Sequence, residues 1–162
     1  MLEQIGVDTQ IKKDTIKSLL SDIFKSCKIH YFDQEISWEI EDDEQLDDNS
    51  ICFSFIRNES EFPIKIEMLR TPDKDNEERG QYLAKIISDN LNCKTITNYR
   101  EKDKPIDYPS DSIIFDKGNA YFANDDCTIW ADGKGGEVKI VKKIDFVNYK
   151  FDDRGNLINV SN

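Results

Sequence analysis

A change in hydrophobic period near residue 28 constrains the fold of this chain more than any other feature of its sequence. Before that point the apolar side chains recur every three or four residues, at Ile16, Leu19, Leu20, Ile23, Phe24 and Cys27. This spacing predicts an amphipathic helix, which Asp8 or Thr9 would cap. After residue 28 apolar and polar residues alternate, as is typical of a half-buried strand. The chain therefore combines helix and sheet.

Three strand-like segments follow this helix. The second and the third cover residues 51–55 and 64–68. The first carries its apolar side chains at Phe32, Ile36, Trp38 and Ile40. Short polar connections separate the three segments, and successive strands joined in this way usually pair with each other. We therefore expect a three-stranded antiparallel meander behind the first helix.

A second helix is predicted after residue 75. Asp75 or Asn76 would cap its start, and Asn92 provides a left-handed residue at its end. Two acidic residues fall in its first turn, where carboxylates suit the helix dipole. Its buried face would consist of Leu83, Ile86, Ile87 and Leu91.

The remaining sequence is rich in strand and turn signals. One strand is expected over residues 93–98. Two hairpins are expected after it. The first covers residues 112–122 around a turn at 116–119, and the second covers residues 128–141 around a loop at 132–136. Strands are also expected at 144–149 and 157–160, on either side of a turn at 152–155. The sequence thus predicts one α+β domain over residues 1–162. It would be a mostly antiparallel β-sheet of meander and hairpins packed with two amphipathic helices.

The net charge of −11 is concentrated in residues 37–62. That stretch contains nine acidic residues and a single base, Arg57, for a net charge of −8, whereas residues 1–36, 63–112 and 113–162 each carry −1. An excess of acid needed only for solubility would be spread more evenly. The acidic balance disfavours direct binding to nucleic acid or to an anionic membrane surface. The most basic stretch, residues 139–143, alternates like a solvated strand.

We expect the acidic stretch to bind a basic partner. Strand alternation would place Glu39 and Glu41 on one face, beside the acids of the following connection. A local charge of this size is felt beyond the Debye length of about 8 Å at physiological salt. The residues assigned to this partner-binding surface are Glu39, Glu41, Asp42, Asp43, Glu44, Asp47 and Asp48.

No set of residues in the sequence identifies an enzyme, a metal site or a cofactor site. His30 is the only histidine, so no two-histidine metal site can form. The glycine-rich residues 133–136 lack the spacing of a phosphate-binding loop and suit a hairpin turn. The carboxylates Asp125, Asp126 and Asp132 would meet around a cation only if the second hairpin brought them together.

The four cysteines indicate a reducing compartment. Cys27, Cys52, Cys93 and Cys127 are widely spaced and form no C-x-x-C pair. The N-terminal residues contain no apolar run of signal-peptide length, and no segment has the length and apolarity of a membrane span. We expect reduced, mostly buried thiols in a cytoplasmic protein.

Residues 83–126 carry a resemblance in their order of elements. A helix, LAKIISDNLN, leads to a strand, CKTITNYR, and then to a strand–turn–strand unit, SIIFDKGNAYFANDD. This order resembles that of immunity proteins of bacterial polymorphic-toxin and contact-dependent growth inhibition systems. The resemblance implies a cytoplasmic protein that binds one cognate toxin domain, often a basic nuclease, and blocks its active site or substrate path. It carries over no functional residue by position.

Two other functions remain open at the level of sequence. A nucleic-acid mimic that inhibits nucleases would also be acidic, although its charge would be expected to cover an elongated surface rather than one segment. A small metal-dependent enzyme would require a cleft with perturbed carboxylates, for which Asp125, Asp126 and Asp132 are the candidates.

Overall fold

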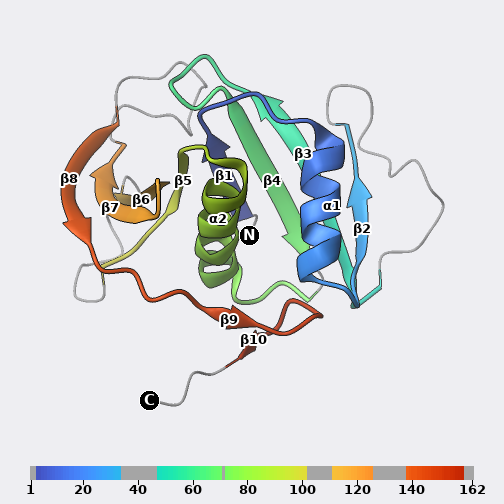
Figure 1. Ribbon diagram of the computed structural model, residues 1–162. Helices are drawn as coiled ribbons and strands as arrows, with labels where there is room; N and C mark the ends of the chain where they lie inside the picture. The colour runs from blue at the N-terminus through green and yellow to red at the C-terminus, as the bar shows by residue number, and fades with distance from the viewer. Residues whose placement is uncertain (1–2, 34–46, 71, 102–110, 126–137, 159–162) are drawn as a thin grey trace.

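The protein is described by a computed structural model covering residues 3–33, 47–70, 72–101, 111–125 and 138–158 (Figure 1). The predicted α+β class is confirmed, since a large, mostly antiparallel sheet packs against helices on one face. The elements follow one another as β1 (Glu3–Val7), α1 (Lys13–Ile23), β2 (Lys28–Tyr31), β3 (Ser50–Arg57), β4 (Ile64–Arg70), α2 (Asn76–Leu91), β5 (Thr95–Asn98), β6 (Asp111–Asp116), β7 (Asn119–Asn124), β8 (Lys139–Ile144), β9 (Lys150–Phe151) and β10 (Leu157–Ile158).

The large sheet has eight strands within the described residues, in the order β2-β3-β4-β1-β5-β6-β7-β8. Its centre is β1, which pairs antiparallel with β4 on one side and with β5 on the other. The sequence analysis did not predict this strand. Five residues are too short for a clear alternating pattern, and Gly6 at its middle lowers the strand propensity of the segment.

The second pair of strands of the predicted meander is confirmed, since β3 and β4 pair antiparallel. The strand on the other side of β3 is β2, which precedes the predicted first strand and runs parallel to β3, with Lys28 opposite Ser50. A parallel pair requires a crossover connection rather than a tight turn. The eighteen residues between Tyr31 and Ser50 provide it. The predicted strand positions Ile36, Trp38 and Ile40 lie outside the described residues.

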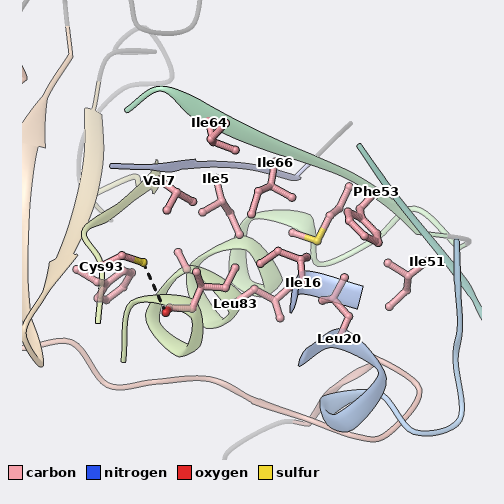
Figure 2. Close-up of a cluster of buried hydrophobic side chains, with 14 of the residues drawn as sticks. Ile5, Val7, Ile16, Leu20, Ile51, Phe53, Ile64, Ile66, Leu83 and Cys93 are labelled. Carbon is pink, nitrogen blue, oxygen red and sulfur yellow. Dashed lines mark hydrogen bonds between the residues drawn. The ribbon is translucent and has the colours of Figure 1, made fainter. Parts of the chain in front are cut away.

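The main hydrophobic core lies between the sheet and the two helices. Figure 2 shows Ile5 of β1 and Ile66 of β4 directed toward Ile16 of α1 and Leu83 of α2, and all four side chains are buried. A smaller cluster, on the opposite face of the sheet, contains Phe62, Ile96, Ile114 and Ala123. Both faces of the central strands are therefore packed.

The two helices have the predicted apolar faces, but the side-chain caps predicted at their starts are not formed. Lys12 precedes α1 without a side-chain cap, and the Asp8 carboxylate instead accepts the backbone N–H of Lys94 at 2.9 Å. Asp8 is thus used to join β1 to the start of β5. The N-cap of α2 is Asp75 in a left-handed conformation without a side-chain cap bond. Asn92 ends the helix in the predicted left-handed conformation.

The first C-terminal hairpin is confirmed, and the remaining C-terminal predictions hold in part. β6 and β7 pair across a turn in which Lys117 and Gly118 have positive φ, as type I′ hairpin turns require. Residues 128–131 lie outside the described residues, and β8 pairs with β7. The strand predicted over residues 144–149 is wrong beyond Ile144, whereas β9 and β10 do flank the predicted turn.

Candidate functional site

The acidic surface is described at one of its ends. Asp47 and Asp48 precede β3, at the end of the sheet edge where β2 also starts. The other five predicted partner-binding residues lie outside the described residues, namely Glu39, Glu41, Asp42, Asp43 and Glu44. The described part of the acidic surface therefore consists of Asp47, Asp48 and their neighbours.

Asp47 organises the start of β3. Its Oδ1 accepts the backbone N–H of Asn49 at 3.0 Å and the hydroxyl of Ser50 at 3.1 Å. Its Oδ2 lies 3.5 Å from Nζ of Lys28 at the start of β2. The Asn49 N–H, followed by the Ser50 hydroxyl, lowers the pKa of the Asp47 carboxyl from its ordinary value. Asp47 thus stays ionised and has a structural task in addition to any partner contact.

Asp48 is exposed beside it, and the described charges of residues 57–61 lie far away. Glu59 and Glu61 follow the other end of β3, which spans roughly 23 Å at about 3.3 Å per residue. Arg57 lies at that end too, where its guanidinium donates to Oε1 of Gln10 at 3.3 Å. This separation exceeds a Debye length of about 8 Å. The only base of the acidic stretch therefore does not neutralise the Asp47–Asp48 end.

The tertiary structure adds Asp153 to the same end of the sheet. Ser26, two residues before β2, donates its hydroxyl to the Asp153 carboxylate at 2.6 Å and its N–H to the Asp153 carbonyl at 3.0 Å. Asp153 is exposed, as is its neighbour Arg154. Sequence reasoning recognised the turn at 152–155 but missed this placement, because the contact joins residues that are 127 positions apart.

His30 lies opposite Cys52 in the register of β2 with β3, but the described thiols are not activated as nucleophiles. His30 lies within β2 and is partly buried. Burial raises the pKa of Cys27, Cys52 and Cys93, the last to about 11. A thiol with a raised pKa is a poor nucleophile at neutral pH, because the thiolate is the reactive form. These three cysteines are free thiols, as predicted, and Cys127 lies outside the described residues.

Of the three carboxylates considered for a metal site, only Asp125 lies within the described part of the chain. There, no group of three or more His, Cys, Asp or Glu side chains is placed so as to hold a metal ion. Asp125 is buried directly after β7, while Asp126 and Asp132 lie outside the described residues.

One cavity of about 260 Å³ lies between α2, the β6–β7 turn and the end of β8. Its lining includes Lys85, Phe115, Lys143 and Phe146. Nζ of Lys85 is already bound to the Asp89 carboxylate at 2.7 Å. The cavity is smaller than sites for small molecules, which usually measure about 300 to 1,000 Å³.

The opposite edge of the sheet, β8, carries basic and apolar side chains in solvent. The predicted solvated strand at 139–143 is confirmed, although Ile140 and Val141 are exposed along with the lysines. The register with β7 shifts between Phe122 and Ala123, and this bulge leaves Val141 without an opposite residue. Lysines and bulges both obstruct the addition of a further strand. We interpret β8 as a protected sheet edge.

Comparison with protein-family models found none that matches the chain, and searches among curated proteins and solved structures found no match either. Within the described residues, neither helix has the length and apolarity needed to cross a membrane.

Proposed function

We propose that this chain is a toxin-neutralising immunity protein that binds a basic toxin domain through the acidic edge at the start of β2 and β3. The observation that supports this proposal is the separation of charge along β3. Asp47 and Asp48 lie at one end of that strand, and Arg57 lies at the other. Lys28, the one lysine of β2, lies at this surface and is already paired with Asp47. A basic partner would therefore meet mainly acidic side chains there.

The physical advantage of such a surface is the rate of association. Opposite charges on two proteins raise the association rate by roughly ten- to a thousand-fold, and salt removes most of this gain. A nuclease domain must bind phosphates with lysines and arginines, and the same side chains would face Asp48 and the acids of residues 39–44. Neutralisation then requires only that binding covers the substrate path, without any chemistry.

The test measures binding to the C-terminal domain of the protein encoded directly upstream of this chain, which the proposed role expects to be basic. The variant Asp42→Lys with Asp48→Lys reverses two charges of the acidic surface. The control, Asp14→Lys with Glu59→Lys, makes the same change in net charge at exposed positions outside that surface. We expect the first variant to lower the association rate by about ten-fold or more at low salt and to flatten its salt dependence. The control should change the rate by no more than about two-fold.

Five outcomes would count against the proposal. Equal effects of the two variants would show that net charge acts without a localised surface, and no effect of either would remove this edge from the interface. Absence of any binding to the upstream domain would reject the immunity role. Inhibition of several unrelated nucleases would instead indicate a nucleic-acid mimic, and calorimetric binding of Ca²⁺, Mg²⁺ or Mn²⁺ would favour a metal-dependent enzyme.

A further inference from the structure

Residues 145–158, which we call the strap, cross the molecule after β8. Figure 1 shows the strap running from the end of β8, past the start of α2, toward the end of α1. Its regular structure in the described residues is the short hairpin of β9 and β10, which closes over the turn at 152–155. The strap thus connects the two edges of the sheet without joining it.

The strap is packed shallowly. Gly155 is its one buried residue, and Val147 is 83% exposed. Phe146 packs on Phe115 and Phe151 packs on Tyr82, both with ring centroids 4.9 Å apart, but both strap rings are only partly buried. These contacts remove much less apolar surface from water than the core side chains between the sheet and the helices.

Two buried arginines hold the turn of the strap. Arg70, at the end of β4, donates from Nη2 to the carbonyl of Arg154 and, at 3.3 Å, to Oδ1 of Asn156. Arg79, in the first turn of α2, donates from Nη1 to the carbonyl of Gly155 at 3.2 Å. With the bond from Ser26 to the Asp153 carbonyl, three consecutive carbonyls are bound by three different elements. Within the described residues, that last bond is the one backbone hydrogen bond from the strap to the α1–β2 region.

The turn also has its own internal structure. Oδ1 of Asp152 accepts the N–H groups of Arg154 at 2.9 Å and Asn156 at 2.8 Å, and the Gly155 N–H donates to the Asp152 carbonyl at 3.0 Å. Gly155 has a φ of +73°, a backbone conformation that residues other than glycine rarely adopt. The hairpin is therefore preformed and can leave and rejoin its arginines without refolding.

We propose that the strap detaches as one unit, pivoting at the end of β8, while the sheet and both helices remain folded. Local opening occurs where few apolar contacts are buried and where the hydrogen bonds that break can be replaced by water. The strap meets both conditions, since its attachment depends on arginine–carbonyl bonds and two half-buried rings. Opening would expose Phe24 and Tyr82, whose rings pack against Phe151 and against each other. This proposal is independent of the immunity role.

The test is proteolysis of the full chain by trypsin under native conditions, followed by mass spectrometry. Lys150 and Arg154 lie in the strap. We expect the rate of cleavage there to exceed the rate that global unfolding would allow. This rate should depend little on low concentrations of urea, because local opening exposes little surface. The cleaved chain should keep its circular dichroism spectrum and slow amide exchange in β1 and β4. Cleavage with the urea dependence of global unfolding, or unfolding of the cleaved chain, would overturn the proposal.

Two glycine variants sharpen this test. A Cβ at Gly155 would lie 2.9 Å from Nε of Arg70, whereas at Gly118, with a φ of +78°, it would meet nothing within 4 Å. Both substitutions strain the backbone, but only Gly155→Ala strains the closed strap. We expect Gly155→Ala to speed strap cleavage by about ten-fold or more and Gly118→Ala to change it by no more than about two-fold. Equal acceleration by both variants would show that cleavage requires global unfolding.

Discussion

β1 and β8 have nearly the same length but opposite environments. The five residues of β1 include a glutamate, a glutamine and a glycine, yet four of them are buried. The six residues of β8 include two isoleucines and a valine, yet five of them are exposed. Hydrophobicity alone does not separate the two strands, since each mixes apolar with charged residues. The position of a strand within the sheet decides its burial.

Each polar or small residue of β1 has a tertiary partner that suits the centre of the sheet. Glu3 forms a buried ion pair with Arg79 of α2, and Gly6 leaves room for Ile96 and Phe62. β8 has one neighbouring strand in the described sheet, and its lysines remain in solvent. The following substitutions test this difference.

The largest expected effect is at Ile5. Ile5 is 0% exposed in the core between β1 and the helices, so Ile5→Ala leaves a cavity. We expect the free energy of unfolding, measured by urea titration, to fall by about 4 kcal/mol. The matched change Ile140→Ala in β8, where the side chain is 53% exposed, should alter it by less than about 0.5 kcal/mol. Similar losses at the two positions would invalidate the comparison.

A smaller effect is expected from adding a methyl group at Gly6. A Cβ there would lie 2.6 Å from Cγ2 of Ile96 and 3.2 Å from Cβ of Phe62. We expect Gly6→Ala to lower the free energy of unfolding by about 2 kcal/mol, as overpacking usually does. Combining it with Ile96→Ala removes the closest contact. The double variant should therefore lose less than the two single losses added together, and strict additivity would refute the steric explanation.

An effect of similar size is expected in the pH dependence at Glu3. Burial raises the pKa of Glu3 to about 7, although the contact with Arg79 acts in the opposite direction. Its other charged neighbours are Arg70, which lowers the pKa, and Asp73, which raises it. Because the folded protein holds this proton more tightly than the unfolded chain, Glu3 favours folding below about pH 4.5, and this contribution is lost as the pH rises to about 7.

The variant Glu3→Gln removes that proton equilibrium. We expect its free energy of unfolding, relative to the unmodified chain, to increase between about pH 4.5 and pH 7 by on the order of 2 kcal/mol. The readout is the change with pH, since loss of the ion pair with Arg79 shifts the absolute value. The exposed substitution Asp89→Asn serves as control. Parallel pH profiles of Glu3→Gln and the unmodified chain would show that burial does not perturb Glu3.

Much of the fold could be predicted from local patterns. The apolar stripe of α2, its left-handed end at Asn92 and the turn at Lys117–Gly118 depend on neighbouring residues, and all three were predicted. The parallel pairing of β2 with β3 depends on a connection of eighteen residues, for which alternation carries no signal. β1 was missed because its burial depends on β4, β5 and α2.

The candidate site likewise has one property that follows from local sequence and others that depend on packing. The charge of −8 over residues 37–62 follows from composition, and it suffices to predict a basic partner. The structure places Arg57 and Glu59 at the far end of β3 and Asp153 beside Ser26. These positions depend on distances between elements. Such distances are a property of the packed molecule.

Local patterns are enough to predict the α+β class, both helices, most strands and the acidic character of one segment, because hydrophobic period and charge are properties of neighbouring residues. Packing of the folded chain sets which strand lies at the centre, which edge strands remain in solvent and which charges lie together. Burial and electrostatic screening depend on separation in space, and contacts such as Glu3 with Arg79 or Ser26 with Asp153 join residues far apart in the chain.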